Sequence, residues 1–190
     1  IMELEDDWIQ YVLDQPMDTI PGTKFVYNSG VTMLLGKILS MATGQSMDKW
    51  AEEKLFNPLG ITDYYWKKTP LGEVDAEGGL YLKPHDLARI GYMVLQKGKW
   101  KDQQIVSEDW LNQSVQAAVV FNDNSGYGFQ WWLGLENGKP VSYNMRGYGG
   151  QFVNVIPGDN MVLVSNGWNI HTKTRRRMDG IFSRVHPVNQ

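Results

Sequence analysis

Hydrophobic residues in the first 115 positions recur at helical spacing, separated by turn-forming residues. This pattern predicts helices over residues 4–13, 31–43, 46–56, 84–98 and 107–115. Gly44 and Gly98 are expected to end the second and fourth helices, and Ser46 and Ser107 to act as N-caps. Residues 61–82 are expected to be irregular, with Gly78-Gly79 as a tight passage of the backbone.

From Tyr127 onward the pattern changes to the alternation of strands. We expect strands over residues 127–133, 141–145, 151–156 and 161–165, with hairpins at Asn137-Gly138 and at residues 157–160. A last helix is expected over about residues 172–185. Helices first and antiparallel strands afterwards are typical of an α+β domain, and neither a repeat nor a linker indicates a second one.

Composition narrows the classes of function. The 190 residues carry a net charge of -3, which gives no electrostatic reason to expect nucleic acid or an anionic membrane as partner. The basic run at residues 173–177 is expected to be a solvated helix face. The absence of cysteine excludes a thiol nucleophile and disulfides, and no apolar stretch is long enough to span a membrane.

Tyr27-Asn28-Ser29-Gly30 stands at the entry to a predicted helix. Spacing alone favours an ordinary amphipathic tyrosine whose hydroxyl is hydrogen-bonded. The functional alternative is a tyrosine that acts as general base, which needs a pKa well below the free value of about 10 and therefore nearby cations.

Arg146-Gly147-Tyr148-Gly149-Gly150-Gln151 leads directly into a predicted strand. The glycines could provide only a bend or bulge at a sheet edge. Alternatively, they clear side chains from a strand on which a substrate lies, so that a backbone N–H can hold an oxyanion.

Other residues carry weaker signals. His85, His171 and His186 lie far apart without metal-ligand spacing, so surface roles are expected and neither a metal nor a cofactor is predicted. Tryptophans such as Trp66, Trp131 and Trp132 could line a substrate groove or fill the core.

In combination the motifs resemble those of the β-lactamase-related (penicillin-recognising) serine hydrolases, a family that spans class C β-lactamases, D,D-peptidases, esterases and 6-aminohexanoate-dimer hydrolases. The resemblance covers residues 15–168 in family order. It rests on Phe25-Val26-Tyr27-Asn28-Ser29-Gly30, Leu34-Leu35-Gly36, Phe56-Asn57-Pro58-Leu59-Gly60, Glu77-Gly78-Gly79-Leu80, Pro84-His85-Asp86-Leu87-Ala88-Arg89 and Gly147-Tyr148-Gly149-Gly150-Gln151.

The resemblance implies a β-lactamase/transpeptidase-like fold, an antiparallel sheet flanked by helices, and specific roles for the matched residues. Tyr27 matches the tyrosine base and Ser29 the polar third position of its motif. Tyr148, Gly149 and Gly150 match the strand motif that is Lys-Thr-Gly in β-lactamases. The Gln151 N–H then corresponds to an oxyanion donor.

Two departures change what is expected. Tyr148 replaces the lysine that would attract a β-lactam carboxylate, which favours an esterase or amidase. The Ser-x-x-Lys nucleophile pair precedes the tyrosine in the family, but no serine occurs among residues 1–26. The one match, Ser46-Met47-Asp48-Lys49, lies downstream and is interpreted as a helix N-cap.

The chain is therefore interpreted as the C-terminal portion of one β-lactamase-like domain, incomplete at its N-terminus, inactive alone and prone to aggregate through an exposed edge and apolar face. The parent is expected to cleave a small ester, amide or short peptide, with a lactam as a further candidate, through an acyl-serine intermediate. No cofactor is expected. The family resemblance favours a periplasmic or secreted location. A non-catalytic domain that binds peptides or cell-wall fragments remains the alternative.

Overall fold

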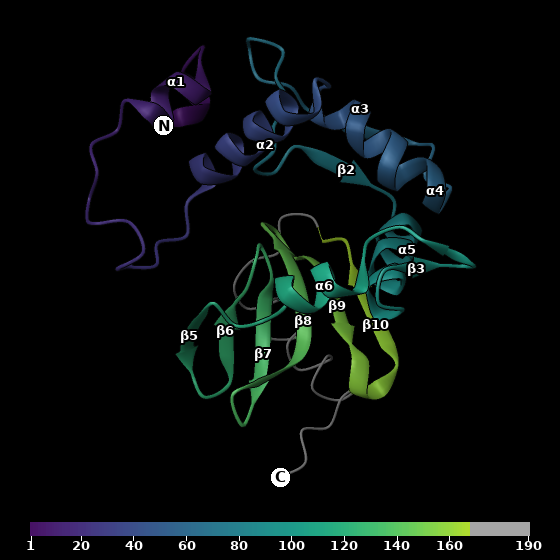
Figure 1. Ribbon diagram of the computed structural model, residues 1–190. Helices are drawn as coiled ribbons and strands as arrows, with labels where there is room; N and C mark the ends of the chain where they lie inside the picture. The colour runs from purple at the N-terminus through teal and green to yellow at the C-terminus, as the bar shows by residue number, and fades with distance from the viewer. Residues whose placement is uncertain (168–190) are drawn as a thin grey trace. The chain divides into compact units, whose positions relative to one another are not determined.

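A computed structural model describes residues 1–167 of the chain, and the predicted helix over residues 172–185 lies outside this range. The described chain forms two compact units (Figure 1). The first comprises Ile1–Asp86 and Lys99–Ile105, and the second comprises Leu87–Gly98 and the chain from Val106 onward. None of the helices within residues 1–167 combines the length and hydropathy needed to cross a bilayer.

The first unit is built mainly from helices. A 3-10 turn η1 (Met2–Leu4) precedes α1 (Trp8–Leu13), which packs against α2 (Ser29–Thr43). Next, α3 (Met47–Ala51), a π-helical turn η2 (Glu52–Phe56) and α4 (Asn57–Leu59) follow one another without interruption. The last helical segment ends at Gly60, whose positive φ of 69° suits glycine.

The predicted irregular stretch over residues 61–82 contains a hairpin that the sequence pattern did not indicate. Its strands are β1 (Tyr64–Trp66) and β2 (Leu80–Leu82), paired antiparallel. The Phe56 side chain, 1% exposed, lies against this hairpin, with its ring centroid 4.7 Å from that of Tyr64 and 6.1 Å from that of Trp66. A smaller hairpin joins β3 (Lys99–Trp100) to β4 (Gln103–Gln104).

The second unit is an antiparallel sheet with strand order β10-β9-β8-β7-β6-β5. Its strands are β5 (Val119–Asn122), β6 (Ser125–Tyr127), β7 (Trp132–Glu136), β8 (Lys139–Gly147), β9 (Gln151–Ile156) and β10 (Met161–Ser165). The predicted hairpins at Asn137-Gly138 and at residues 157–160 are both present. Positive φ values of 50° and 74° at Asn137 and Gly138 fit the expected tight turn.

Two helices cover one face of this sheet. The helix α5 (Pro84–Leu95) belongs to the second unit from Leu87 onward. Its Gly91 lies so close to the sheet that an added Cβ would be 2.6 Å from a Val162 methyl carbon. α6 (Glu108–Ser114) is capped by Ser107 as predicted, and Val115 after it packs with Leu133 and Leu135. The α+β prediction, an antiparallel sheet flanked by helices, is confirmed.

One predicted strand is wrong. Residues 127–133 do not form a continuous strand, because the backbone turns after Tyr127 and strand structure resumes at Trp132. Gly128 lies so close to the carbonyl oxygens of Ser114 and Gln116 that an added Cβ would be 2.4 and 2.8 Å from them. Gln130 has a positive φ of 64°, which is incompatible with an extended strand.

The contact of Phe56 with the β1–β2 hairpin predicts a large stability loss on truncation. We expect Phe56→Ala to lower the free energy of unfolding by about 3–5 kcal/mol, because it removes a fully buried ring and leaves a cavity. Urea unfolding followed by far-UV circular dichroism measures this change. Leu71→Ala, at an exposed position, is the control, and equal effects of the two substitutions would contradict the assignment of Phe56 to the core.

Candidate functional site

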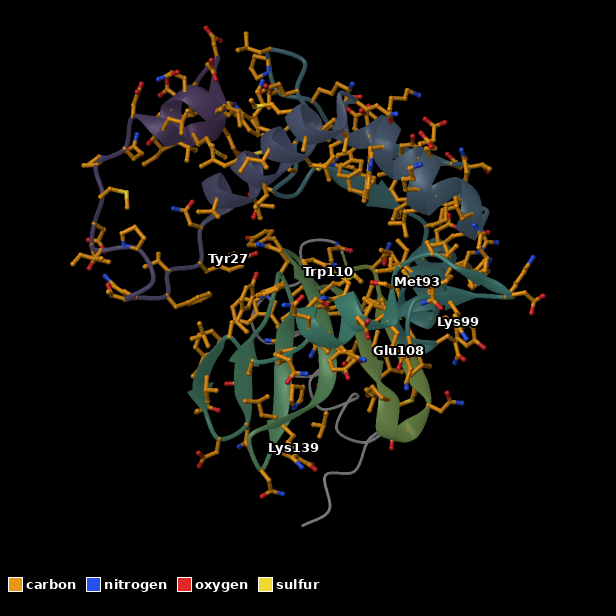
Figure 2. The ribbon with its side chains drawn as sticks, in the orientation of Figure 1. Tyr27, Met93, Lys99, Glu108, Trp110 and Lys139 are labelled. Carbon is orange, nitrogen blue, oxygen red and sulfur yellow. The ribbon has the colours of Figure 1, made fainter. Side chains whose placement is uncertain are left out.

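Tyr27 lies immediately before α2, on the extended segment that enters the helix (Figure 2). The Asn28 side chain caps α2 by accepting a hydrogen bond of 2.8 Å from the Gly30 N–H. Gly30 packs against Val12 of α1, where a Cβ would lie 2.6 Å from a valine methyl carbon. Capping and packing thus fix the start of the helix, and the Tyr27 side chain beside it is 58% exposed.

The helix begins two residues earlier than the pattern predicts, so Ser29 is its first residue rather than part of a preceding loop. The Ser29 side chain interacts with the Glu77 carboxyl group. Burial raises the pKa of Glu77, the interaction with Ser29 opposes this rise, and the interaction with Glu3 adds to it. Sequence reasoning had assigned no role to Glu77, and its spacing from Ser29 carries no signal of their contact.

The turn over residues 75–79 brings Glu77 to this position. Asp75 Oδ1 accepts hydrogen bonds from the backbone N–H groups of Glu77 and Gly78, at 3.2 and 3.3 Å. Gly79 is in close contact with Asp75, where a Cβ would lie 2.6 Å from the Asp75 Cβ, whereas Gly78 faces open space. The predicted tight passage at Gly78-Gly79 is therefore confirmed for Gly79.

The same turn is packed against α2. The Ala76 N–H lies 3.2 Å from the Met33 Sδ and donates to it. A Cβ added to Gly36 would lie 2.9 Å from the Ala76 methyl group, which leaves space only for glycine unless the turn moves. The Leu34-Leu35-Gly36 and Glu77-Gly78-Gly79 motifs thus meet within the first unit.

In the second unit, Tyr148, Gly149 and Gly150 form the turn between β8 and β9 rather than part of a strand. Gly149 and Gly150 have φ values of 77° and 95°, so both adopt a conformation that favours glycine. The Tyr148 side chain at this turn is 98% exposed. Gln151 is the first residue of β9, as the sequence predicts, and pairs with Gly147.

The hydrogen bonds around this turn determine where the Gln151 backbone points. The Gly167 N–H and the Ser165 hydroxyl both donate to the Gly150 carbonyl oxygen, at 3.1 and 3.3 Å. Because successive residues of an antiparallel strand direct their backbone groups to opposite sides, the Gln151 N–H points toward Gly147 of β8. The Gln151 side-chain amide donates to the Gly167 carbonyl oxygen.

In the Ser46-Met47-Asp48-Lys49 match, the serine and the lysine side chains each have another partner. The Ser46 hydroxyl donates to the Asp48 carboxylate, and the Lys49 ammonium group pairs with Glu52 on the exposed surface. Ser46 does precede α3, as predicted, but its side chain makes no capping bond to the backbone.

The tryptophans singled out in the sequence have structural contacts. The Trp66 indole N–H donates to the Asp75 carbonyl oxygen, at 2.8 Å. Trp131 packs against the core cluster under α6. Trp132 lies 5.1 Å from the Tyr127 ring and has the Arg146 guanidinium group above its face. His85 is in the first turn of α5, and His171 and His186 lie outside the described residues.

Comparison with known sequences gives a match over most of the chain. The profile of the Beta-lactamase family matches residues 2–177. A protein of Escherichia coli O157:H7 named as a D-alanyl-D-alanine carboxypeptidase is 37% identical over an alignment that covers 82% of this chain and 48% of that protein. A protein of the same name from Salmonella newport is 18% identical, over 86% of this chain and 50% of its own length. The chain spans about half the length of these curated relatives.

Solved structures also resemble the chain. A 6-aminohexanoate-dimer hydrolase from Bacillus anthracis matches with a TM-score of 0.76 and 22% identity, over 94% of this chain and 49% of that one. A penicillin binding protein from Bacillus halodurans matches with a TM-score of 0.71 and 19% identity, over 92% of this chain and 63% of that one. At such low identity the likeness shows a shared fold.

The contact between Gly36 and Ala76 predicts that a methyl group at position 36 destabilises the first unit. Replacing glycine by alanine inside a helix normally stabilises the helix by up to about 1 kcal/mol. We expect Gly36→Ala instead to lower the free energy of unfolding by about 1–2 kcal/mol, because the added methyl group overlaps Ala76. Urea unfolding tests this, with Gly78→Ala as the control, and a stabilised Gly36→Ala variant would rule out the close packing.

Proposed function

Since the chain belongs to the β-lactamase family, whose profile matches residues 2–177, we propose that it is the C-terminal portion of one β-lactamase-like domain in a serine hydrolase. Relatives named as a D-alanyl-D-alanine carboxypeptidase and a 6-aminohexanoate-dimer hydrolase support hydrolysis through an acyl-serine intermediate. The observation that carries the proposal is the family match together with the exposed position of Tyr27 at the start of α2.

In the proposed reaction Tyr27 is the general base. Its phenolate oxygen takes the proton of the nucleophilic serine while the serine oxygen attacks the substrate carbonyl carbon. The proton then passes to the leaving group, which departs as an alcohol or amine, and water hydrolyses the acyl-serine. The nucleophilic serine and its lysine are proposed to lie in the protein outside the 190 residues.

The proposed substrate is a small ester, amide or short peptide rather than a β-lactam. Tyr148 stands where β-lactamases have a lysine, so this position supplies no cation to attract a carboxylate. The exposed Tyr148 side chain offers a phenol ring and hydroxyl instead, and the glycines beside it leave the turn without further side chains.

We expect Tyr27→Phe, in the protein encoded by the complete reading frame, to lower kcat/KM by about 10²–10⁴-fold, the range typical of a lost general base. Hydrolysis of a p-nitrophenyl ester and of a D-alanyl peptide measures the change. Tyr65→Phe, at an exposed position of β1, should leave activity within about twofold on the general expectation for surface changes.

Three results would contradict this proposal. Full activity of Tyr27→Phe would exclude the tyrosine base. Labelling of Ser46 by a serine-directed fluorophosphonate would make Ser46 the nucleophile. A 190-residue chain that hydrolyses the ester above background, with turnover abolished by Tyr27→Phe, would show that the nucleophile lies within this sequence.

The proposed oxyanion donor, the Gln151 N–H, carries a geometric requirement. Because this N–H points toward Gly147, it can bind an oxyanion only when the last pair of the β8–β9 ladder opens. We expect its amide hydrogen to exchange with solvent at least about tenfold faster than that of Val153, which is buried in the same strand. Hydrogen exchange followed by NMR measures both rates, and equal protection would remove Gln151 as a donor.

A further inference from the structure

The helix α2 has two packed sides and one apolar side that is exposed. Gly30 packs on α1, while Met33 and Gly36 pack on the turn over residues 75–79. Because an α-helix has about 3.6 residues per turn, positions three or four apart share a side. The side opposite Met33 and Gly36 carries an apolar stripe formed by Val31, Leu35, Ile38 and Ala42.

The apolar stripe is exposed along the helix. Val31, Leu35 and Ile38 are 50%, 46% and 59% exposed. None of the residues of the stripe is charged, and the one charged residue of α2, Lys37, lies on another side and pairs with Glu73. A surface helix normally turns polar residues toward water and buries its apolar side against a neighbour. The stripe therefore has the character of an interface.

The stripe begins next to the candidate base. Tyr27 precedes Val31 by four residues, and the Asn28 cap between them fixes the start of the helix. Two packed helices have axes about 8–10 Å apart, with the side-chain ridges of one in the grooves of the other. A helix packed along the stripe would therefore pass Tyr27 within the reach of a side chain.

Length and chemistry together indicate what covers the stripe. The alignment with the Escherichia coli O157:H7 relative covers only 48% of that protein, so such a protein has about as much chain again to pack. None of residues 1–26 is a serine, and the nucleophile is proposed to lie outside the 190 residues. A general base must come within about 2.6–3.2 Å of the group that it deprotonates. The segment with the serine must then pack around Tyr27, where the stripe offers apolar surface.

We propose that the apolar stripe of α2 is the docking surface for an amphipathic helix of the same protein that lies outside the 190 residues and carries the nucleophilic serine. This inference rests on the proposed function, which places that serine outside the chain. The docked helix would turn apolar residues spaced three and four apart toward the stripe, and its serine toward Tyr27. Burial of the stripe and alignment of the serine with its base would then be one event.

The first test measures whether the stripe is covered in the protein encoded by the complete reading frame. The 190 residues contain no cysteine, so Ile38→Cys adds one thiol to them, and peptide mass spectrometry follows its modification by iodoacetamide. Leu71→Cys, at an exposed position of the same unit, is the matched control. We expect Ile38→Cys to react at least about tenfold more slowly than the control, because a covered thiol reacts only after local opening.

Protein concentration and chain length identify other ways of covering the stripe. In the dilute 190-residue chain both thiols should react at similar rates, and protection of Ile38→Cys there would overturn the inference, because this chain would cover its own stripe. Protection in the complete protein that disappears on dilution would overturn it as well, because a second copy would be the occupant.

The second test identifies the segment that contacts the stripe. The photo-crosslinker p-benzoylphenylalanine replaces Val31 in the complete protein, and a fluorophosphonate labels the nucleophilic serine in the same sample. Mass spectrometry should find the crosslink in the segment that contains the labelled serine. A crosslink to the second unit of the chain, or to another copy of the protein, would overturn the inference.

The third test places a charge on the stripe. Ile38→Asp should lower fluorophosphonate labelling and kcat/KM of the complete protein by at least about tenfold, because docking would bury an unpaired carboxylate. Leu71→Asp is the control. In the 190-residue chain, Ile38→Asp should leave the midpoint of urea unfolding unchanged, because the side chain is exposed there. A midpoint lowered equally in both proteins would overturn the docking role.

The outcomes separate the two proposals. An active protein with a fluorophosphonate-reactive serine, in which Ile38→Cys reacts as fast as Leu71→Cys, would overturn the docking surface and leave the proposed hydrolase standing. A protein that hydrolyses neither the ester nor the D-alanyl peptide and carries no reactive serine would overturn the proposed function and with it this inference.

Discussion

The buried carboxylate of Asp75 is the constraint on which the candidate site of the first unit depends. The carboxylate binds backbone N–H groups of its own turn and the ammonium group of Lys67. The backbone carbonyl oxygen of Asp75 accepts a hydrogen bond from the Trp66 indole N–H. The Lys67 ammonium group also lies over the Trp8 ring. Groups from α1, the β1–β2 hairpin and the 75–79 turn are thus linked through Asp75 and Lys67. Burial of the Asp75 carboxylate is favourable because backbone N–H groups and the Lys67 ammonium group satisfy it.

Local chemistry made much of the fold predictable. Helix ends depend on single residues with few alternatives, so Gly44 and Ser107 mark boundaries that the structure also has. The hairpin at Asn137-Gly138 is equally local, because two successive positive φ values are needed there. The position of Tyr27 just before a helix was predicted as well, although the Asn28 cap starts that helix at Ser29, two residues earlier than the pattern indicates.

Contacts between distant parts of the chain were not predictable from these patterns. The aromatic run after Tyr127 alternates like a strand, yet the approach of Gly128 to the end of α6 breaks it. The strands of the β1–β2 hairpin have three residues each and are separated by a long loop. Three residues are too few to show the alternation from which a strand is predicted. The contact between Ser29 and Glu77 likewise depends on tertiary packing, and the motif resemblance named both segments without joining them.

The hairpin turn at Tyr148 has a consequence for how such a protein can evolve. A side chain that is almost wholly exposed makes no packing contribution, so its exchange for another residue leaves the folded state almost unaffected. The two glycines that follow supply the positive φ values of the turn whatever side chain precedes them. Position 148 can therefore change charge under selection for a new ligand at almost no cost in stability, while the strands that carry it stay the same.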